Sequence, residues 1–383
     1  MKLKLKETPE QIELIKAMGS KNATASREAS EAFAAFLGPV IQEVIQTAGT
    51  ANMIYSDAPF NEDDNPSYPL DLYYNENDGY VTVWSQHLAG GLPTSQVEGV
   101  AEMKIATYRL DSAVSWLKRY ARRSRLDVVS KAIERMATEV LIKQERNAWA
   151  VILRALAEAS TNVQSTGSAV ATKHIVKSAT DGKLVLGDMS DLMTRLKRIN
   201  ESFSGHTPVA PWSNGLTDLY VSPEVKGQIR AFAWNPLNTS GNGAAGSGAN
   251  KYNQTLPDNV REEIYRNAGM QSIFGVNIHE MVELGAGRKY NTLFNSFTSG
   301  NDVPGHNGGD WQSSDEIIVG LDNSRGSFIR PVAREHESGG TFTALPDDQF
   351  NAYGSRVEKV GFYGFLEEGR ICIDSRAIAG IAI

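Results

Sequence analysis

The chain has 383 residues, of which 41% are hydrophobic and 22% are charged. This composition is typical of a globular chain with two or three packed units, and it excludes a mainly disordered protein. The net charge of −7 argues against broad binding to nucleic-acid phosphates, and no apolar run approaches the ~18 residues that cross a bilayer, so we expect no membrane contact.

The first ~50 residues carry an apolar stripe at helical spacing. Its members recur at every third or fourth position within two runs: Ile12, Ile15 and Met18, and then, after the break at Gly19-Ser20, Phe33, Leu37, Ile41 and Ile45. The neighbouring sequence offers this stripe no obvious partner, so we interpret residues 1–55 as an N-terminal arm that packs on another molecule. An ordinary N-terminal core helix is the alternative.

Residues 51–78 are punctuated by prolines, and their acidic side chains face no Lys or Arg within the segment. These acidic residues are Asp57, Glu62, Asp63, Asp64, Asp71, Glu76 and Asp78. Asp78-Gly79 is a good hairpin tip between two aromatic and β-branched runs, and residues 102–110 alternate as a paired strand requires. We therefore predict an extended β-hairpin loop over residues 56–117.

Residues 126–159 give the strongest local signal, an apolar stripe without Gly or Pro. It predicts one helix about 50 Å long, which would serve as a spine. The densest positive run of the chain precedes it and contains Lys118, Arg119, Arg122, Arg123 and Arg125. Positive charge opposes the dipole at a helix start, so this run would gain from an external acidic partner, although a solvated helix entry is the common alternative. This region is assigned to residues 118–183.

The middle region, residues 184–330, mixes strands with helices. Leu219-Tyr220-Val221 reads as a buried strand that leads into the helix cap, first-turn proline and acid of Ser222-Pro223-Glu224. Residues 331–383 are rich in strands, and the last segment, 375–383, is apolar enough that we expect it to be buried.

No motif for chemistry stands out. The glycine-rich stretch 239–250 is followed by Lys251-Tyr252, which is no phosphate-binding loop, and no two histidines have metal-ligand spacing. The single cysteine, Cys372, excludes an intrachain disulfide. We expect no catalytic residue, cofactor or metal. The charges around Arg330 and in residues 334–337 are interpreted as a salt-bridge patch between subunits rather than a site.

The order of these parts resembles the major capsid proteins of tailed bacteriophages, which have the Hong Kong 97-like fold. Residues 219–230 are similar to the strand, cap and helix of the family's axial domain, and residues 365–379 resemble its closing strand. The resemblance implies an α+β fold with an arm (1–55), an extended loop (56–117), a peripheral domain with the spine helix (118–183), an axial domain (184–330) and C-terminal strands that complete both domains (331–383).

The resemblance further implies a structural protein that assembles as hexamers and pentamers into an icosahedral head around double-stranded DNA, without enzymatic activity. Its partners would be copies of itself, portal, scaffolding and decoration proteins, and packaged DNA bound without sequence specificity. It would reside in the virion after assembly in the host cytoplasm. The shell hypothesis also expects the first hundred residues to find their partners on other copies.

We further predict that the acidic stretch of one subunit lies against the basic run of another. The expected contact residues are Asp57, Glu62, Asp63, Asp64, Asp71, Lys118, Arg119, Arg122, Arg123 and Arg125. Three alternatives stay open: an encapsulin-type cellular compartment with the same shell fold, a tail tube or sheath protein, and a cytoplasmic hydrolase with a convergent His-Asp-Ser site.

Overall fold

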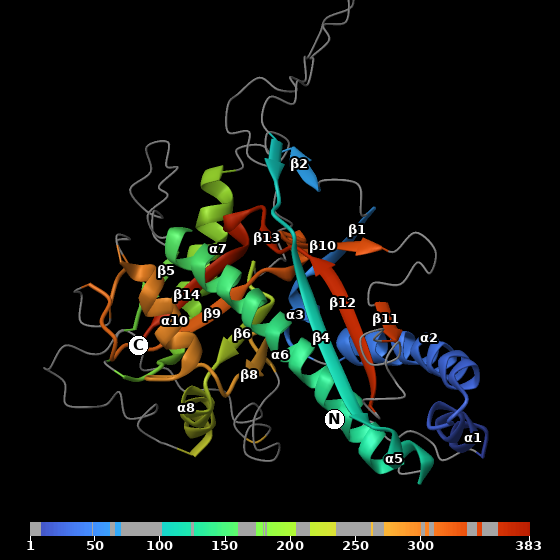
Figure 1. The fold of residues 1–383 in the computed structure, drawn as a ribbon. Coiled ribbons are helices and arrows are strands. Elements are labelled where there is room, and N and C mark those ends of the chain that lie inside the picture. Colours follow the sequence, from blue (N-terminus) through green and yellow to red (C-terminus); the bar gives the residue numbers. More distant parts are fainter. Residues whose placement is uncertain are drawn as a thin grey trace, which may run out of the picture. The chain divides into compact units, whose positions relative to one another are not determined.

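The computed structural model describes residues 9–47, 49–61, 66–69, 102–123, 126–159, 174–178, 180, 182–203, 215–234, 262, 272–299, 303–305, 310–334, 343–346 and 359–383. Helices and mixed sheets make an α+β protein (Figure 1). The chain divides into two compact units. Unit 1 comprises Met1–Pro69, Ala101–Ala148 and Phe328–Ile371, and unit 2 comprises Leu70–Val100, Trp149–Ser327 and Cys372–Ile383.

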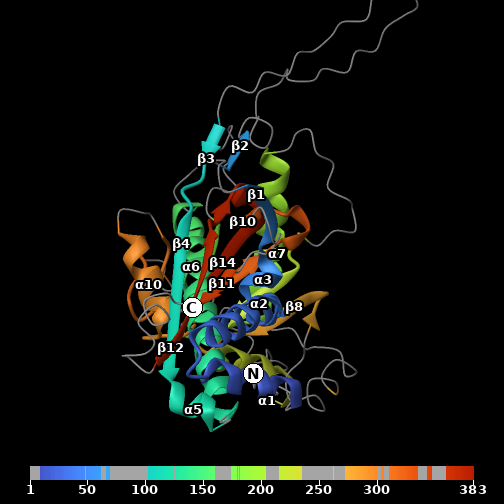
Figure 2. The same ribbon diagram turned by 45° about the vertical axis from the view of Figure 1, so that its right-hand side comes forward.

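Unit 1 is built around a six-stranded sheet with the order β1-β10-β12-β11, in which β4 also pairs with β12 and β13 with β10. The strands are β1 Ser56–Asn61, β4 Tyr108–Leu117, β10 Phe328–Arg334, β11 Thr343–Pro346, β12 Lys359–Glu368 and β13 Ile371–Cys372. β1 runs parallel to β10, whereas β4 and β12 are antiparallel over their full length. Figures 1 and 2 show these two long strands side by side.

Four short or medium helices and the first part of α6 accompany this sheet: α1 Pro9–Met18, α2 Ala23–Thr47, α3 Ala51–Ile54, α5 Lys118–Arg122 and α6 Leu126–Ala159. β2 Ser67–Pro69 pairs with β3 Glu102–Lys104 as a separate two-stranded ladder. The helix predicted over residues 126–159 is confirmed at both ends. The run 102–110 forms two strands, and the hairpin predicted between 70 and 84 lies outside the described residues.

The core of unit 1 joins the N-terminal helices to the sheet. The ring of Phe362 on β12 lies 5.4 Å from the ring of Phe33 on α2 and 5.3 Å from that of Trp116 on β4. Ile15 and Leu37 are buried in the same core. Aromatic and aliphatic contacts of this kind bury large apolar areas, which accounts for the folding of these helices onto the sheet.

The expectation that this apolar stripe packs on another molecule is wrong for its described residues, because α1 and α2 pack on their own unit, whereas the assignment of residues 1–55 as an arm stays a prediction. The apolar stripe finds its partners on β4, β12 and α6, which are more than 60 residues away in sequence. The expectation that the first hundred residues pack on other copies is therefore wrong for the described residues of α1 and α2. Residues 62–65 and 70–100, to which the expectation also applies, lie outside the described residues.

Unit 2 contains a second six-stranded sheet, with the order β5-β14-β9-β6-β8-β7. Its strands are β5 Ile175–Lys177, β6 Asp218–Val221, β7 Ser272–Ile273, β8 Val276–Glu280, β9 Ile317–Leu321 and β14 Ile378–Ala382. Its described helices are the last part of α6, from Trp149 on, and α7 Leu186–Phe203, α8 Pro223–Trp234 and α10 Lys289–Thr298, with short turns η2 Asn323–Arg325 and η3 Ser375–Ala377.

Local sequence signals explain several of these elements. Ser222 accepts a hydrogen bond from the backbone N–H of Val225 at 3.1 Å, so the predicted cap starts α8 directly after β6. The last strand, β14, is buried at all five positions, as its apolar sequence predicts. Each predicted domain is one continuous range of residues, whereas each of the two units combines segments that are distant in the sequence. The predicted domain boundaries stay a prediction.

Candidate functional site

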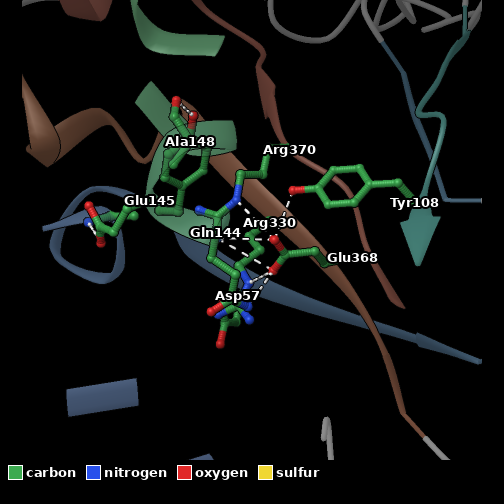
Figure 3. A network of polar contacts seen from close by, with 10 residues as sticks. Asp57, Tyr108, Gln144, Glu145, Ala148, Arg330, Glu368 and Arg370 are labelled. Atoms are coloured by element: carbon green, nitrogen blue, oxygen red, sulfur yellow. Dashed lines mark hydrogen bonds and ion pairs between the residues drawn. The ribbon is translucent and has the colours of Figure 1, made fainter. Parts of the chain in front are cut away.

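A buried charge network lies in unit 1 around Glu368, at the end of β12 (Figure 3). Positions 362, 364, 366 and 368 of this strand are all buried, so the alternation that buries Phe362 also buries Glu368. The Glu368 carboxylate accepts hydrogen bonds from Arg330 Nε at 2.8 Å, from the Tyr108 hydroxyl at 2.8 Å and from Gln144 Nε2 at 3.0 Å. Arg370 approaches it at 3.4 Å.

The network holds two buried guanidinium groups against one buried carboxylate. Two neighbours compensate for the excess positive charge. Arg330 Nη1 reaches the Asp57 carboxylate at 3.3 Å, and Arg370 lies over the ring of Tyr55 at 4.8 Å, a cation–π distance. Desolvation and the charge of Glu368 raise the pKa of Tyr108 to about 12, so this hydroxyl stays a donor at neutral pH.

This arrangement is suited to holding elements together. Each partner of Glu368 comes from a different element: Arg330 from β10, Tyr108 from β4 and Gln144 from α6. Arg330 is only 3% exposed and its partners belong to the same chain. The interpretation of Arg330 as part of a salt-bridge patch between subunits is therefore wrong, because the ladder between β10 and β12 draws this residue into the interior.

Most of the basic run forms α5, a short helix that is separate from α6 and precedes it. Arg119 and Arg123 are exposed, while Lys118 is buried. Arg122 donates from Nε to the carbonyl oxygen of Gly19 at 2.7 Å, just after the end of α1. Positive charge at the end of a helix interacts favourably with its dipole, so Arg122 has a partner within the chain. Arg125 lies outside the described residues.

Only one of the predicted acidic contact residues is described. Asp57 on β1 has a side chain that is 48% exposed and pairs with Arg330. Asp57 thus forms an ion pair within unit 1 through one carboxylate oxygen, and about half of its side-chain surface is exposed to solvent. Glu62, Asp63, Asp64 and Asp71 lie outside the described residues, so the structure brings together no predicted acidic residue with the basic run.

The described residues of unit 2 include an acid–histidine pair. His279 Nε2 lies 2.8 Å from Asp218 Oδ1, and the Thr217 hydroxyl donates to Oδ2 of the same carboxylate at 2.7 Å. Desolvation would raise the pKa of Asp218, but the hydrogen bonds from His279, Thr217 and Asn277 outweigh it and lower the pKa below its ordinary value. The pair is a potential fragment of a hydrolase site.

The pair does not extend to a triad among the described residues. There, no Ser, Thr or Cys side chain hydrogen-bonds to His279, whose ring stacks on Tyr220 at 4.9 Å instead. The described part of the chain also contains no group of three His, Cys, Asp or Glu side chains able to hold a metal ion. Within the same part, no helix is both long and apolar enough to span a membrane.

Sequence reasoning missed Glu368, Tyr108, Gln144 and Arg370 as members of one network. One signal was available for Glu368. It follows Phe362, Gly364 and Leu366 at a spacing of two, which assigns a carboxylate to the buried face of a strand and so requires a basic partner.

No protein-family model matches the chain, and no curated protein matches its sequence. Among solved structures, the chain is similar to the capsid structure of the cyanophage P-SCSP1u, with 12% identity, 86% of each chain covered and a TM-score of 0.50. Other similar structures are the mature capsid of bacteriophage PhiM1 (12% identity, 87% and 86% covered, TM-score 0.43) and a virus-like particle from Pyrococcus furiosus (12% identity, 91% and 98% covered, TM-score 0.43).

The likeness to the cyanophage capsid structure extends over most of both chains. The chain therefore has the α+β fold of a capsid subunit. More specifically, this is the Hong Kong 97-like capsid fold, and the fold class predicted from the sequence is confirmed.

Proposed function

We propose that this chain is the major capsid protein of a tailed bacteriophage, which assembles as hexamers and pentamers into an icosahedral head around double-stranded DNA. The observation that carries the proposal is the similarity in fold to the cyanophage capsid structure, over 86% of both chains. The role is structural, its main partners are copies of itself, and the protein resides in the virion.

The chemistry of the chain supports a structural role. The best-connected polar side chains, those around Glu368, are buried and joined to one another, where they can hold strands and a helix but cannot reach a substrate. The acid–histidine pair of unit 2 has no hydroxyl or thiol nucleophile among the described residues. Portal, scaffolding and decoration proteins, and DNA bound without sequence specificity, complete the proposed set of partners.

The proposed contact between an acidic and a basic segment of neighbouring subunits now rests on fewer residues. On the basic side, Arg119 and Arg123 are exposed and can meet a neighbour, whereas Lys118 is buried and Arg122 bonds to Gly19. On the acidic side, Asp57 keeps 48% of its side chain exposed. Complementary charges of this kind set the orientation of partners more than the strength of binding.

Assembly is tested directly with recombinant protein by negative-stain microscopy and light scattering. We expect closed shells or rings of five and six subunits. A small discrete oligomer without rings would contradict the proposal and favour an enzyme. Nuclease-protected double-stranded DNA inside particles from the natural source is expected for a phage head, whereas particles that enclose protein cargo instead of DNA would favour the cellular compartment.

The charge contact is tested with the double variant R119E/R123E. We expect a folded subunit that forms no shells, because the new negative charges repel the acidic segment of the neighbour. The matched control is K131E/K143E, which adds the same charge at exposed positions of α6. Shells of normal yield from R119E/R123E would refute the contact.

A further inference from the structure

Four basic side chains follow the exposed side of α6 within unit 1. They are Lys131, Arg135, Lys143 and Arg146, here called the basic row, and all four are exposed. An α-helix turns about 100° per residue, so Lys131, Arg135 and Arg146 lie within about 60° of one another around the axis, with Lys143 beside them. From its first to its last member the row is about 22 Å long.

The core of unit 1 determines the direction in which the row faces. Val129, Ile133 and Val140 of the same helix are buried in that core, at 0%, 1% and 4% exposure. At about 100° per residue, these three side chains point about half a turn away from Lys131 and Arg135. The burial of one side of α6 therefore holds the basic row on the opposite, solvent-facing side.

The row brings like charges close together. Lys131 and Arg135 are four residues apart, and Lys143 and Arg146 are three apart. Side chains at these spacings are neighbours on a helix surface, and like charges placed there destabilise the helix. The fold itself therefore gains nothing from this choice of residues, and such departures are expected at functional positions.

Exposed arginines elsewhere in the chain are paired along their helices. Arg27 lies 2.9 Å from Glu31 on α2, and Arg154 lies 2.7 Å from Glu158 further along α6. No member of the basic row forms an ion pair with any residue that the structure describes, although the exposed Glu139 lies within about one turn of two of them. The four positive charges are thus available to a partner outside the subunit.

We propose that the basic row binds the phosphate backbone of the packaged double-stranded DNA, by charge and without regard to base sequence. DNA presents a negative charge about every 1.7 Å along its axis, which gives a linear array that a straight row of cations can follow. Contacts of Lys and Arg to phosphates carry no sequence information. The inference rests on the proposed shell function and names the surface on which the subunit meets the DNA.

The polarity of this face favours DNA over a protein partner. The centre of a protein–protein interface is apolar and depleted of charge. Among the described residues of α6, Ile142 is the exposed large hydrophobic side chain, and it is only 38% exposed. Phosphates need cations and no apolar surface, so the row is suited to DNA.

The net charge of −7 makes the proposed binding weak. The subunit as a whole repels DNA, so attraction is confined to the row and depends strongly on salt. A weak contact repeated on every copy of a shell lets the DNA move while it is packaged.

The first test is fluorescence anisotropy of a labelled 30-base-pair duplex of random sequence, titrated with the unassembled subunit between 20 and 200 mM KCl. Four phosphate contacts predict a slope of about −3.6 for the logarithm of the binding constant against that of the salt concentration. The variant K131Q/R135Q/K143Q/R146Q should bind at least about tenfold more weakly at 20 mM KCl, with a slope close to zero.

The matched control is K16Q/K21Q/R27Q/K104Q, which removes the same charge from exposed positions of unit 1 outside the row. It should bind DNA as the wild type does, and circular dichroism should show that both variants are folded. Equal losses in the two variants would overturn the inference, because net charge and not the row would then govern binding. The absence of binding by the wild type at 20 mM KCl would also overturn it.

The second test asks whether the row meets DNA or another protein. The variant K131Q/R135Q/K143Q/R146Q should form shells of normal yield without DNA, because the row faces the contents of the shell. For the same reason, K131E/K143E remains the matched control for R119E/R123E. Loss of shells by the folded quadruple variant would assign the row to a contact between subunits and overturn the inference. Tighter binding of the row to a synthetic peptide of the acidic residues 57–78 than to DNA would overturn it as well.

The outcomes separate the inference from the proposed function. Wild-type shells together with DNA binding that depends on the row support both. Wild-type shells without such binding overturn the inference and leave the shell function standing. A wild-type protein that forms neither shells nor rings overturns both.

Discussion

Arg330 Nε lies 2.8 Å from Glu368 Oε2, and both side chains are almost fully withdrawn from solvent, at 4% and 0% exposure. The two residues belong to neighbouring strands, β10 and β12. A buried charge pair of this kind is favourable only while both charges are present, because each would otherwise be desolvated without compensation. The pair therefore makes the integrity of unit 1 depend on a single carboxylate.

Replacing that carboxylate in E368Q should destabilise unit 1 severely. Arg370 would remain buried without an ionised partner, and Arg330 would keep only the half-exposed Asp57 at 3.3 Å. Removing one member of a buried pair costs about 3–5 kcal/mol. We expect a clear fall in the midpoint of urea unfolding of the unassembled subunit, followed by circular dichroism. An unchanged midpoint would show that the network contributes little to stability.

The matched control for E368Q is D57N, at the exposed edge of the same network. Asp57 pairs with Arg330 at 3.3 Å, but its side chain is 48% exposed. Ion pairs open to water contribute about 1 kcal/mol or less. D57N should therefore shift the urea midpoint only slightly, and a loss as large as that of E368Q would contradict the assignment of Glu368 as the central charge.

The sequence predicts elements whose signal is local. The stripe of apolar residues at a spacing of three or four, uninterrupted by Gly or Pro, defines α6, and Ser222-Pro223-Glu224 marks the start of α8. The network around Glu368 has no such signal, because Gln144 and Glu368 are 224 residues apart in the chain. The packing of α2 on β12 likewise depends on a distant strand, which explains why packing on another molecule was predicted in its place.

Gly49 should be intolerant of any side chain. Its φ of +102° disfavours other residues, and an added Cβ would overlap Glu145 Oε1. Glu145 accepts hydrogen bonds from the Ala51 N–H at 2.9 Å and the Thr50 hydroxyl at 2.8 Å, at the start of α3. G49A should therefore combine backbone strain with loss of this helix cap and lower stability by about 2–4 kcal/mol.

The control for G49A is G326A, where φ is +59° and no atom would contact the added Cβ within 4 Å. Only backbone strain applies there, so the expected loss is about 1 kcal/mol. Thermal unfolding of both variants gives the comparison. Equal losses would show that the contact with Glu145 has no part in the effect.

His174 should make the stability of unit 2 fall on acidification. Burial lowers the pKa of this imidazole and nearby Arg195 lowers it further, whereas the hydrogen bond from Nδ1–H to the Ile378 carbonyl at 2.8 Å and the charge of Asp374 oppose the change. The folded-state pKa thus lies below the ordinary 6.5. A group that binds a proton more weakly when folded stabilises the protein fully above its unfolded pKa, and this contribution is lost as the pH falls below it.

The measurement for His174 is the unfolding midpoint at pH 7.5 and pH 5. We expect the H174Q variant, whose amide can still donate to Ile378, to lose less stability between these two pH values than the wild type. The difference should reach at most about 1.4 kcal/mol per pH unit. Parallel losses in both proteins would assign the acid sensitivity to other groups.

Cys372, the single cysteine of the chain, should be nearly inert in the folded protein. Burial and the charge of Asp374 raise the pKa of its thiol to about 12, although a hydrogen bond with the Asp374 backbone opposes them. The thiolate is the reactive form, so its reaction with a disulfide reagent at pH 8 should be roughly a thousandfold slower than that of an ordinary thiol. Absorbance at 412 nm after adding Ellman's reagent follows this rate, with S115C on the exposed face of β4 as the fast control.

Urea should restore an ordinary reaction rate at Cys372, because unfolding removes both causes of the raised pKa. Equal rates at Cys372 and at position 115 in the folded S115C variant would show that the thiol is not shielded.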